Sequence, residues 1–142
     1  MTQKQIELLK STWVMAAELD PVAVGGLFYD HLFQIAPQVR SLFHIPVPEQ
    51  SKKLLAMVNY VIIKLDRLDD ILDEVAKLAQ RHKGYGVKSE HYAVVGEAFL
   101  WTLEQGLGKN WNAEVKEAWT ECYTILSGAM IAASSDETQQ AA

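Results

Sequence analysis

The sequence predicts an all-α fold with about six or seven helices in one domain. Apolar residues recur at spacings of three and four over most of the 142-residue chain, as on the buried face of a helix. Helix-start and helix-stop residues divide the chain at regular intervals. No stretch alternates with a period of two, and the strand-like run 60–63 continues a helical face. We therefore expect helices that pack pairwise around a pocket.

The first two helices carry start signals of different kinds. Thr2 with Gln5 three residues later forms a possible capping box. Asp20 followed by Pro21 is typical of an N-cap and the first helical position, and Pro37 interrupts the second helix. Two glycines, at 25 and 26, would cost about 1 kcal/mol each inside that helix. A close crossing by another helix at this point would compensate for them.

Prolines at 37, 46 and 48 bracket a short broken segment, residues 38–47, which we expect to be a 3₁₀ turn and a corner. A third long helix is expected to start near residues 48–50. Its inner face would carry Gln50, Leu54, Met57, Val58, Val61, Ile62 and Leu65.

The next helix ends near Gly84 or Gly86, and His82 lies one turn before that end. His82 follows Leu78 by four residues and Val75 by seven, so it continues the apolar stripe that also holds Ile71 and Ala79. A histidine held in this way could ligate a metal through its imidazole. The alternative interpretation is a core histidine bonded to a backbone carbonyl.

Two further helices complete the predicted domain. Ser89 is expected to cap the first of them, which Gly106 and Gly108 would end. Asn112 is expected to start the last helix. We place the domain at residues 1–133, followed by a polar, frayed tail at residues 134–142.

Composition and charge exclude several classes of protein. The net charge is −5 with no basic patch, which argues against a nucleic-acid partner. The single cysteine, Cys122, cannot form an intrachain disulfide or a cysteine-based zinc or iron–sulfur site. The chain starts without a hydrophobic signal region and contains no apolar run of membrane-spanning length. We expect a cytoplasmic protein.

Three segments taken together resemble one family. They are LFYDHLFQIAPQVRSLF at 27–43, RHKGYGVKSEHYAVVGE at 81–97 and AWTECY at 118–123. Their order and spacing resemble the globin domain of bacterial haemoglobins, and more narrowly the single-domain bacterial haemoglobins related to the haem half of flavohaemoglobins. The resemblance covers about residues 1–133 and implies a globin fold that binds haem b.

The resemblance also implies a role for each site residue. His82 matches the proximal iron ligand, and a neutral histidine with one open distal position suits O₂ binding. Tyr29 and Gln50 match distal side chains that donate hydrogen bonds to O₂. Leu54 matches the apolar residue over the iron, and Phe43 matches the ring that packs flat against the porphyrin. Gly25 would face Ser51 where the second and third helices cross.

The remaining haem contacts are less specific. Lys53, Arg81 and Lys83 are candidates to pair with haem propionates, although they can equally be solvated surface side chains. Val87, Tyr92 and Tyr123 match haem-proximal positions. In the family a glutamate of the last helix works with the tyrosine at 92 to strengthen the proximal ligand, but Ser134 stands there and Glu137 comes three residues late. We expect His31, His44 and His91 at the surface or boundary rather than at haem, and Trp13, Trp101, Trp111 and Trp119 in the core or at its boundary.

These residues support three functions. The first is reversible binding of O₂, CO or NO by a monomer or homodimer. The second is an enzyme, an NO dioxygenase, which would need a separate reductase because the chain has no glycine-rich dinucleotide loop. The third is a gas sensor, which we rank low because sensors usually need an output module and we expect none here. The departure at Ser134 favours ligand binding over fast oxygen chemistry, and a haem-free globin-fold domain would have no use for Tyr29, Gln50 and His82 together.

Overall fold

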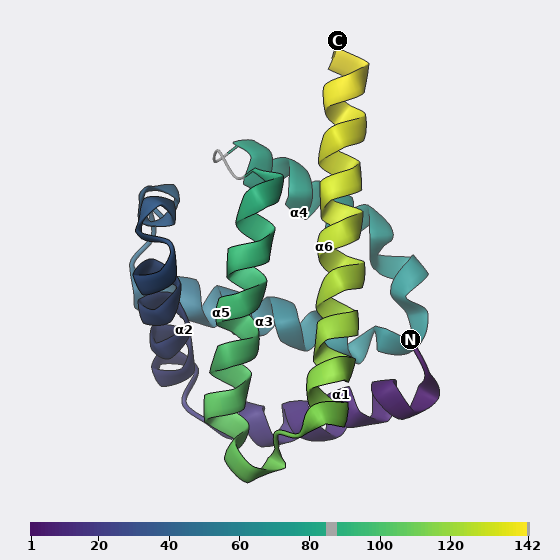
Figure 1. Ribbon diagram of the computed structural model, residues 1–142. Coiled ribbons are helices and arrows are strands. Elements are labelled where there is room, and N and C mark those ends of the chain that lie inside the picture. Colours follow the sequence, from purple (N-terminus) through teal and green to yellow (C-terminus); the bar gives the residue numbers. More distant parts are fainter. Residues whose placement is uncertain (85–87, 142) are drawn as a thin grey trace.

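The structure is a computed structural model that describes the backbone of residues 1–84 and 88–141, with side chains except at 69, 72, 82–84, 89 and 134–141. The described residues form helices and no strand (Figure 1), which confirms the predicted all-α fold. The α helices are α1 (Gln3–Ala17), α2 (Pro21–Ile35), α3 (Val47–Ile63), α4 (Leu72–Gly84), α5 (Ser89–Leu107) and α6 (Ala113–Ala141). The 3₁₀ segments are η1 (Pro37–Leu42), η2 (Leu65–Ile71) and η3 (Gly108–Asn110).

Helix starts follow the predicted capping chemistry at three places. The Thr2 hydroxyl accepts from the Gln5 backbone N–H at 3.1 Å, and the Gln5 side chain accepts from the Thr2 N–H at 2.9 Å. Asp20 accepts from the Val22 N–H at 3.2 Å, with Pro21 in the first helical position. Asn112 accepts from the Val115 N–H at 2.9 Å. Each cap satisfies a backbone donor that has no partner within the helix.

The predicted cap at Ser89 is wrong. Ser89 is already the first residue of α5, and Lys88 occupies the N-cap position. The Lys88 backbone N–H donates to Nδ1 of His91 at 2.9 Å, so a side chain in the first turn of α5 accepts from the backbone of the N-cap residue. This hydrogen bond places His91 at the start of α5, where its side chain is half-buried.

The end of the chain is described as helix in its backbone. α6 reaches Ala141 and extends beyond the other helices in Figure 1. The side chains from residue 134 onward lie outside the described part of the chain. The division between a domain ending at 133 and a tail stays a prediction.

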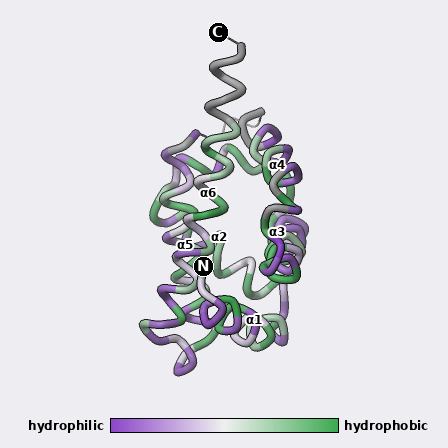
Figure 2. Tube along the Cα trace, turned by 90° about the vertical axis from the view of Figure 1, so that its right-hand side faces the viewer, coloured by the Kyte–Doolittle hydropathy of each residue, from purple (hydrophilic) through white to green (hydrophobic). Residues whose placement is uncertain are grey.

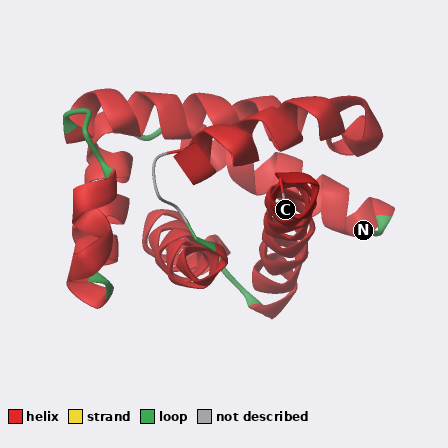
Figure 3. Cartoon of the chain, turned by 90° about the horizontal axis from the view of Figure 1, so that it is seen from above, coloured by secondary structure: helices red, strands yellow, loops and turns green. Residues whose placement is uncertain are grey.

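The helices form two sides of the molecule. α5 and α6 lie side by side on one side, and α3 and α4 lie on the other, as the end-on view of α5 and α6 in Figure 3 also shows. α1 crosses below and packs on α5 and α6, while α2 packs against both α3 and α5 (Figure 1). α4 packs against α6. Hydrophobic and hydrophilic segments follow one another along each helix in Figure 2, as expected for helices with one buried face.

Two apolar clusters form the interior. The larger one joins α1, α3, α4, α5 and α6 around Trp13 and Trp119, whose ring centroids are 6.1 Å apart. The Trp119 Nε1–H donates to the Thr12 hydroxyl at 3.0 Å, and that hydroxyl donates to the Leu8 carbonyl at 2.7 Å. The smaller cluster joins α2, η1 and α5: Phe28, Tyr29, Leu32, Ala36, Val39 and Ala98. It contains the predicted distal tyrosine and therefore positions the candidate site.

Within the described residues, no helix is long and apolar enough to cross a membrane.

Candidate functional site

α2 and α3 cross in close contact at one point. Gly25 of α2 lies against Ser51 of α3, whose side chain is completely buried. A Cβ atom at Gly25 would overlap the Cβ and Oγ of Ser51, whereas one at Gly26 would meet nothing within 4 Å. The predicted contact between Gly25 and Ser51 is confirmed, and it explains why a helix tolerates glycine at position 25.

Tyr29 is a buried phenol close to this crossing. Its side chain is 2% exposed, and burial raises the pKa of Tyr29 to about 12. A hydrogen bond with the Gln50 side chain acts in the opposite direction. The phenol is protonated at neutral pH, so its hydroxyl can donate a hydrogen bond to a polar group that lies within this apolar cluster. The structure brings together the two predicted distal residues.

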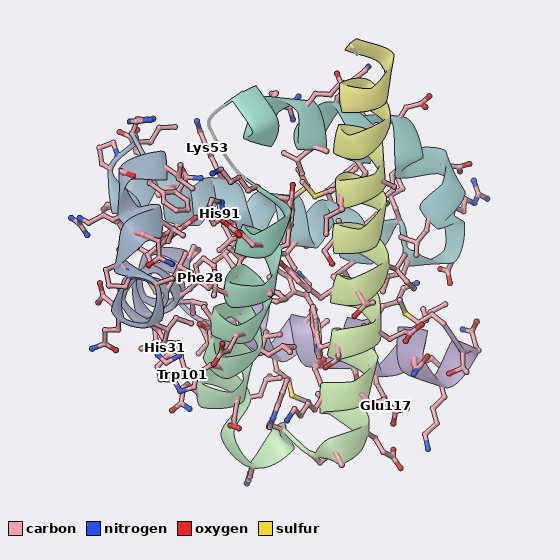
Figure 4. All side chains as sticks on the ribbon, turned by 45° about the horizontal axis from the view of Figure 1, so that its top comes forward. Phe28, His31, Lys53, His91, Trp101 and Glu117 are labelled. Carbon is pink, nitrogen blue, oxygen red and sulfur yellow. The ribbon has the colours of Figure 1, made fainter. Side chains whose placement is uncertain are left out.

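Aromatic rings hold Tyr29 on several sides. The Tyr29 ring meets Phe28 edge-on at 4.8 Å and Phe43 edge-on at 5.3 Å between centroids. Phe33 lies 6.0 Å from Tyr29 and 5.6 Å from Phe43. Figure 4 shows Phe28 projecting between α2 and α5. Such edge-on contacts fix the orientation of a ring as well as burying its surface.

Our sequence reasoning missed two members of this group. Phe33 follows Tyr29 by four residues, so helical periodicity could have placed it on the same face. The Arg40 guanidinium lies over the Phe33 ring at 5.0 Å from its centroid. Arg40 belongs to η1, and no periodic pattern in the sequence indicates that its side chain reaches back to α2.

The rim of the smaller cluster is apolar but not closed. Several hydrophobic side chains pack against this cluster and are only half-buried: Phe43, Val47, Leu54, Val94, Val95 and Phe99. Gln50 is also half-buried. Apolar surface of this kind gains free energy when an apolar group covers it. The combination of apolar walls with a phenol and an amide fits a flat hydrophobic group such as haem with a small polar ligand beside Tyr29.

The predicted iron ligand lies on the expected helix. His82 is in α4, two residues before its end at Gly84, and the residues that precede it on the stripe, Val75 and Ala79, are buried. The side chain of His82 lies outside the described part of the structure, and Val87 lies outside the described residues altogether. Haem ligation by His82 therefore stays a prediction.

Tyr92 and Tyr123 connect α5 to α6. The Tyr123 hydroxyl donates to the Tyr92 backbone carbonyl at 2.6 Å. A Cβ atom at Gly96 would lie 2.5 Å from Cε2 of Tyr123, so the ring rests directly on the α5 backbone. Burial raises the pKa of Tyr123, and burial also raises the pKa of Tyr92. The Tyr123 hydroxyl therefore links α6 to α5 through this hydrogen bond.

The other polar candidates lie toward the outside. Lys53 and Arg81 are exposed, and the side chain of Lys83 is outside the described part, so propionate pairing stays a prediction. His44 is exposed, and His31 stacks on Trp101 at 3.9 Å with 5° between the rings (Figure 4). Among the described side chains, no cluster of three or more His, Cys, Asp or Glu residues could hold a metal ion. A lone imidazole on a haem iron would not form such a cluster.

Comparison with known proteins identifies relatives of the chain. The Globin family model matches residues 26–130. Neuroglobin-1 of Oncorhynchus mykiss is 29% identical over 144 residues, covering 92% of this chain and 90% of that protein. A flavohemoprotein of Bacillus subtilis is also 29% identical and covers 99% of this chain. The chain spans only 36% of that flavohemoprotein.

Solved structures agree on the fold. A bacterial globin from Campylobacter jejuni superposes with a TM-score of 0.84 at 23% identity, covering 97% of this chain and 99% of that one. An engineered carbene transferase from Rhodothermus marinus superposes with a TM-score of 0.86 at 22% identity, covering 100% and 99%. The similarity extends over the helices that carry Tyr29, Gln50 and His82.

Proposed function

Because this chain belongs to the globin family, whose members bind haem, we propose that it holds haem b through His82 and reversibly binds O₂ beside Tyr29 and Gln50. One observation carries this proposal: the buried Tyr29 phenol interacts with the half-buried Gln50 amide inside an apolar, aromatic cluster. A tyrosine with a purely structural role would need only one fixed hydrogen-bond partner. This pair lies beside half-buried apolar side chains that a flat hydrophobic group could cover.

When bound, haem supplies an iron centre that takes O₂, CO or NO as a ligand. The chain supplies the surroundings of that centre. Phe43 and Leu54 would provide apolar surface against the group and exclude water, since both pack on the Tyr29 cluster. His82 would hold the iron from α4. Lys53 and Arg81 are exposed cations that could meet the propionates at the edge of the protein.

Tyr29 and Gln50 would determine how long the gas stays. A ligand that gathers negative charge accepts a hydrogen bond more strongly in an apolar surrounding than in water. Tyr29 is a proton donor at neutral pH because its pKa is about 12. Gln50 contributes an amide that can orient the phenol or donate directly. We therefore expect these side chains to slow the release of O₂ more than the release of CO, which develops less charge.

An absorption experiment tests the proposal. The purified protein, mixed with hemin, is recorded in the ferric form, the reduced form and the reduced form with CO. We expect a haem spectrum in each state and a reversible change on adding and removing O₂ from the reduced protein. A preparation that remains colourless after mixing with hemin would contradict the proposal.

A second candidate is an NO dioxygenase that depends on a separate reductase. A neighbour in fold carries nitric oxide dioxygenase in its name, and the flavohemoprotein likeness extends over nearly the whole chain. Ser134 stands where the family carries the glutamate that works with the tyrosine at 92, and this departure favours ligand binding instead.

NO consumption separates the two candidates. We expect the O₂-loaded protein to consume one equivalent of NO without a reductase and to cycle slowly with a generic one. Rapid sustained turnover with the reductase would favour the enzyme.

We also propose a cytoplasmic protein, either a monomer or a homodimer.

A further inference from the structure

The contact between Gly25 and Ser51 involves the backbone of α3. A Cβ atom at Gly25 would lie 2.8 Å from Cα of Ser51, in addition to its overlap with the Ser51 side chain. Rotating the serine side chain cannot relieve a contact with Cα. A larger residue at position 25 would therefore have to push α2 and α3 apart.

The two distal side chains are placed close to this contact along each helix. Tyr29 follows Gly25 by four residues, which puts it one turn along the same face of α2. Gln50 immediately precedes Ser51 in α3. At about 1.5 Å of rise per residue, both side chains start within about 6 Å, measured along the helix axis, of the point of contact. The distance between phenol and amide must follow the separation of the helices.

Ser51 itself makes no polar contribution to the site. Its hydroxyl donates to the Val47 carbonyl of its own helix at 2.7 Å, and its side chain is completely buried. What Ser51 contributes toward α2 is its small size. Gly25 contributes the complementary absence of a side chain. Gly26, next to it, has open space where a Cβ would stand.

We propose that Gly25 and Ser51 are positioning residues, whose contact sets the separation of α2 and α3 at which Tyr29 and Gln50 meet one gas ligand. The effect on a gas rests on the proposed function. The effect on the interaction between the Tyr29 and Gln50 side chains does not, because both residues belong to the chain itself.

The first experiment compares Gly25→Ala with Gly26→Ala in the hemin-loaded protein. We expect Gly25→Ala to speed O₂ release about tenfold, the size of a lost hydrogen bond to a partly charged acceptor. The CO stretching frequency should shift toward that of Tyr29→Phe. Gly26→Ala should leave both unchanged. In a Tyr29→Phe background, Gly25→Ala should have no further effect on release.

Rescue distinguishes positioning from a general loss of structure. Ser51→Gly removes the overlapping Cβ and Oγ but leaves the contact with Cα, so it should restore part of the slow release in the Gly25→Ala protein. Unchanged release in Gly25→Ala would overturn the proposal. The proposal would also be overturned if Gly25→Ala changed O₂ release equally in the parent and in the Tyr29→Phe background. The same holds if Ser51→Gly restored none of the slow release in the Gly25→Ala protein.

A second readout does not involve haem. In urea unfolding of the haem-free chain, a double-mutant cycle of Tyr29→Phe with Gln50→Leu measures the coupling between the two side chains. We expect a coupling of about threefold in the unfolding constant for the parent and none in Gly25→Ala. If the parent takes up no haem, the proposed function fails, and this cycle alone decides the positioning role: equal coupling in both proteins would overturn it.

Discussion

The two apolar clusters differ in the hydrogen-bond partners of their buried polar groups. In the larger cluster the Trp119 Nε1–H donates to Thr12, whose hydroxyl donates in turn to the Leu8 carbonyl. Both of these hydrogen bonds are accepted by other groups of the protein. In the smaller cluster Tyr29 has only the Gln50 side chain, which is itself half-buried. Buried polar groups normally have a hydrogen-bond partner inside the protein. This difference is what we expect if the larger cluster is a structural core and the smaller one holds the proposed ligand site.

We expect the largest loss of stability from a substitution in the larger cluster. Trp119 is 2% exposed and packs against Trp13 and Phe99. Trp119→Ala should lower the free energy of unfolding by about 3–5 kcal/mol, because it leaves a cavity and removes the hydrogen bond that the indole donates to the Thr12 hydroxyl. Urea unfolding measures this change. A loss below that of Tyr29→Phe would contradict the distinction between the two clusters.

Tyr29→Phe should give the opposite pattern. It removes one hydroxyl and keeps the ring contacts, so stability should change little, but O₂ release should become at least about tenfold faster, since a hydrogen bond to a charged acceptor is worth about 1.5–3 kcal/mol. Stopped-flow displacement of O₂ by CO measures the rate. An unchanged rate would place Tyr29 outside the ligand's surroundings.

Thr12→Val is the matched change in the larger cluster. It leaves the Trp119 Nε1–H without its acceptor at 3.0 Å, and the unfolding free energy should fall by about 1–3 kcal/mol. Release of O₂ should stay at the parent rate. If release changed as much as in Tyr29→Phe, the two clusters would not be independent.

The smallest effect concerns alkaline pH. The pKa of Tyr29 is about 12 in the folded protein against an ordinary value of 10.0, so the folded state favours the protonated phenol. The resulting stability is fully present below pH 10 and is lost as pH rises from 10 to 12. Unfolding free energy measured over this range should fall less steeply in Tyr29→Phe than in the parent. Equal slopes would mean that Tyr29 is not the buried phenol described here.

The sequence could predict the features that depend on local chemistry. Capping at Thr2, Asp20 and Asn112 needs only neighbours within three residues, and the structure has all three caps. The resemblance also placed Gly25 against Ser51 correctly. The cap at Ser89 was wrong because α5 begins one residue earlier than predicted, with Lys88 at the N-cap and its N–H donating to the His91 imidazole.

Contacts between helices that follow neither from local chemistry nor from the family resemblance could not be predicted. The stacking of His31 on Trp101 joins α2 to α5 over 70 positions of sequence, and Arg40 reaches Phe33 only because η1 turns back on α2. Neither contact leaves a periodic signal. The bond from Tyr123 to the Tyr92 backbone likewise depends on the packing of α6 against α5.

Hemin titration of the haem-free chain measures whether His82 holds the haem. We expect saturation at one haem per chain for the parent and for His31→Ala, whose imidazole stacks on Trp101. We expect loss of tight binding for His82→Ala. Equal binding by the parent and His82→Ala, or no binding by the parent, would contradict haem ligation by His82.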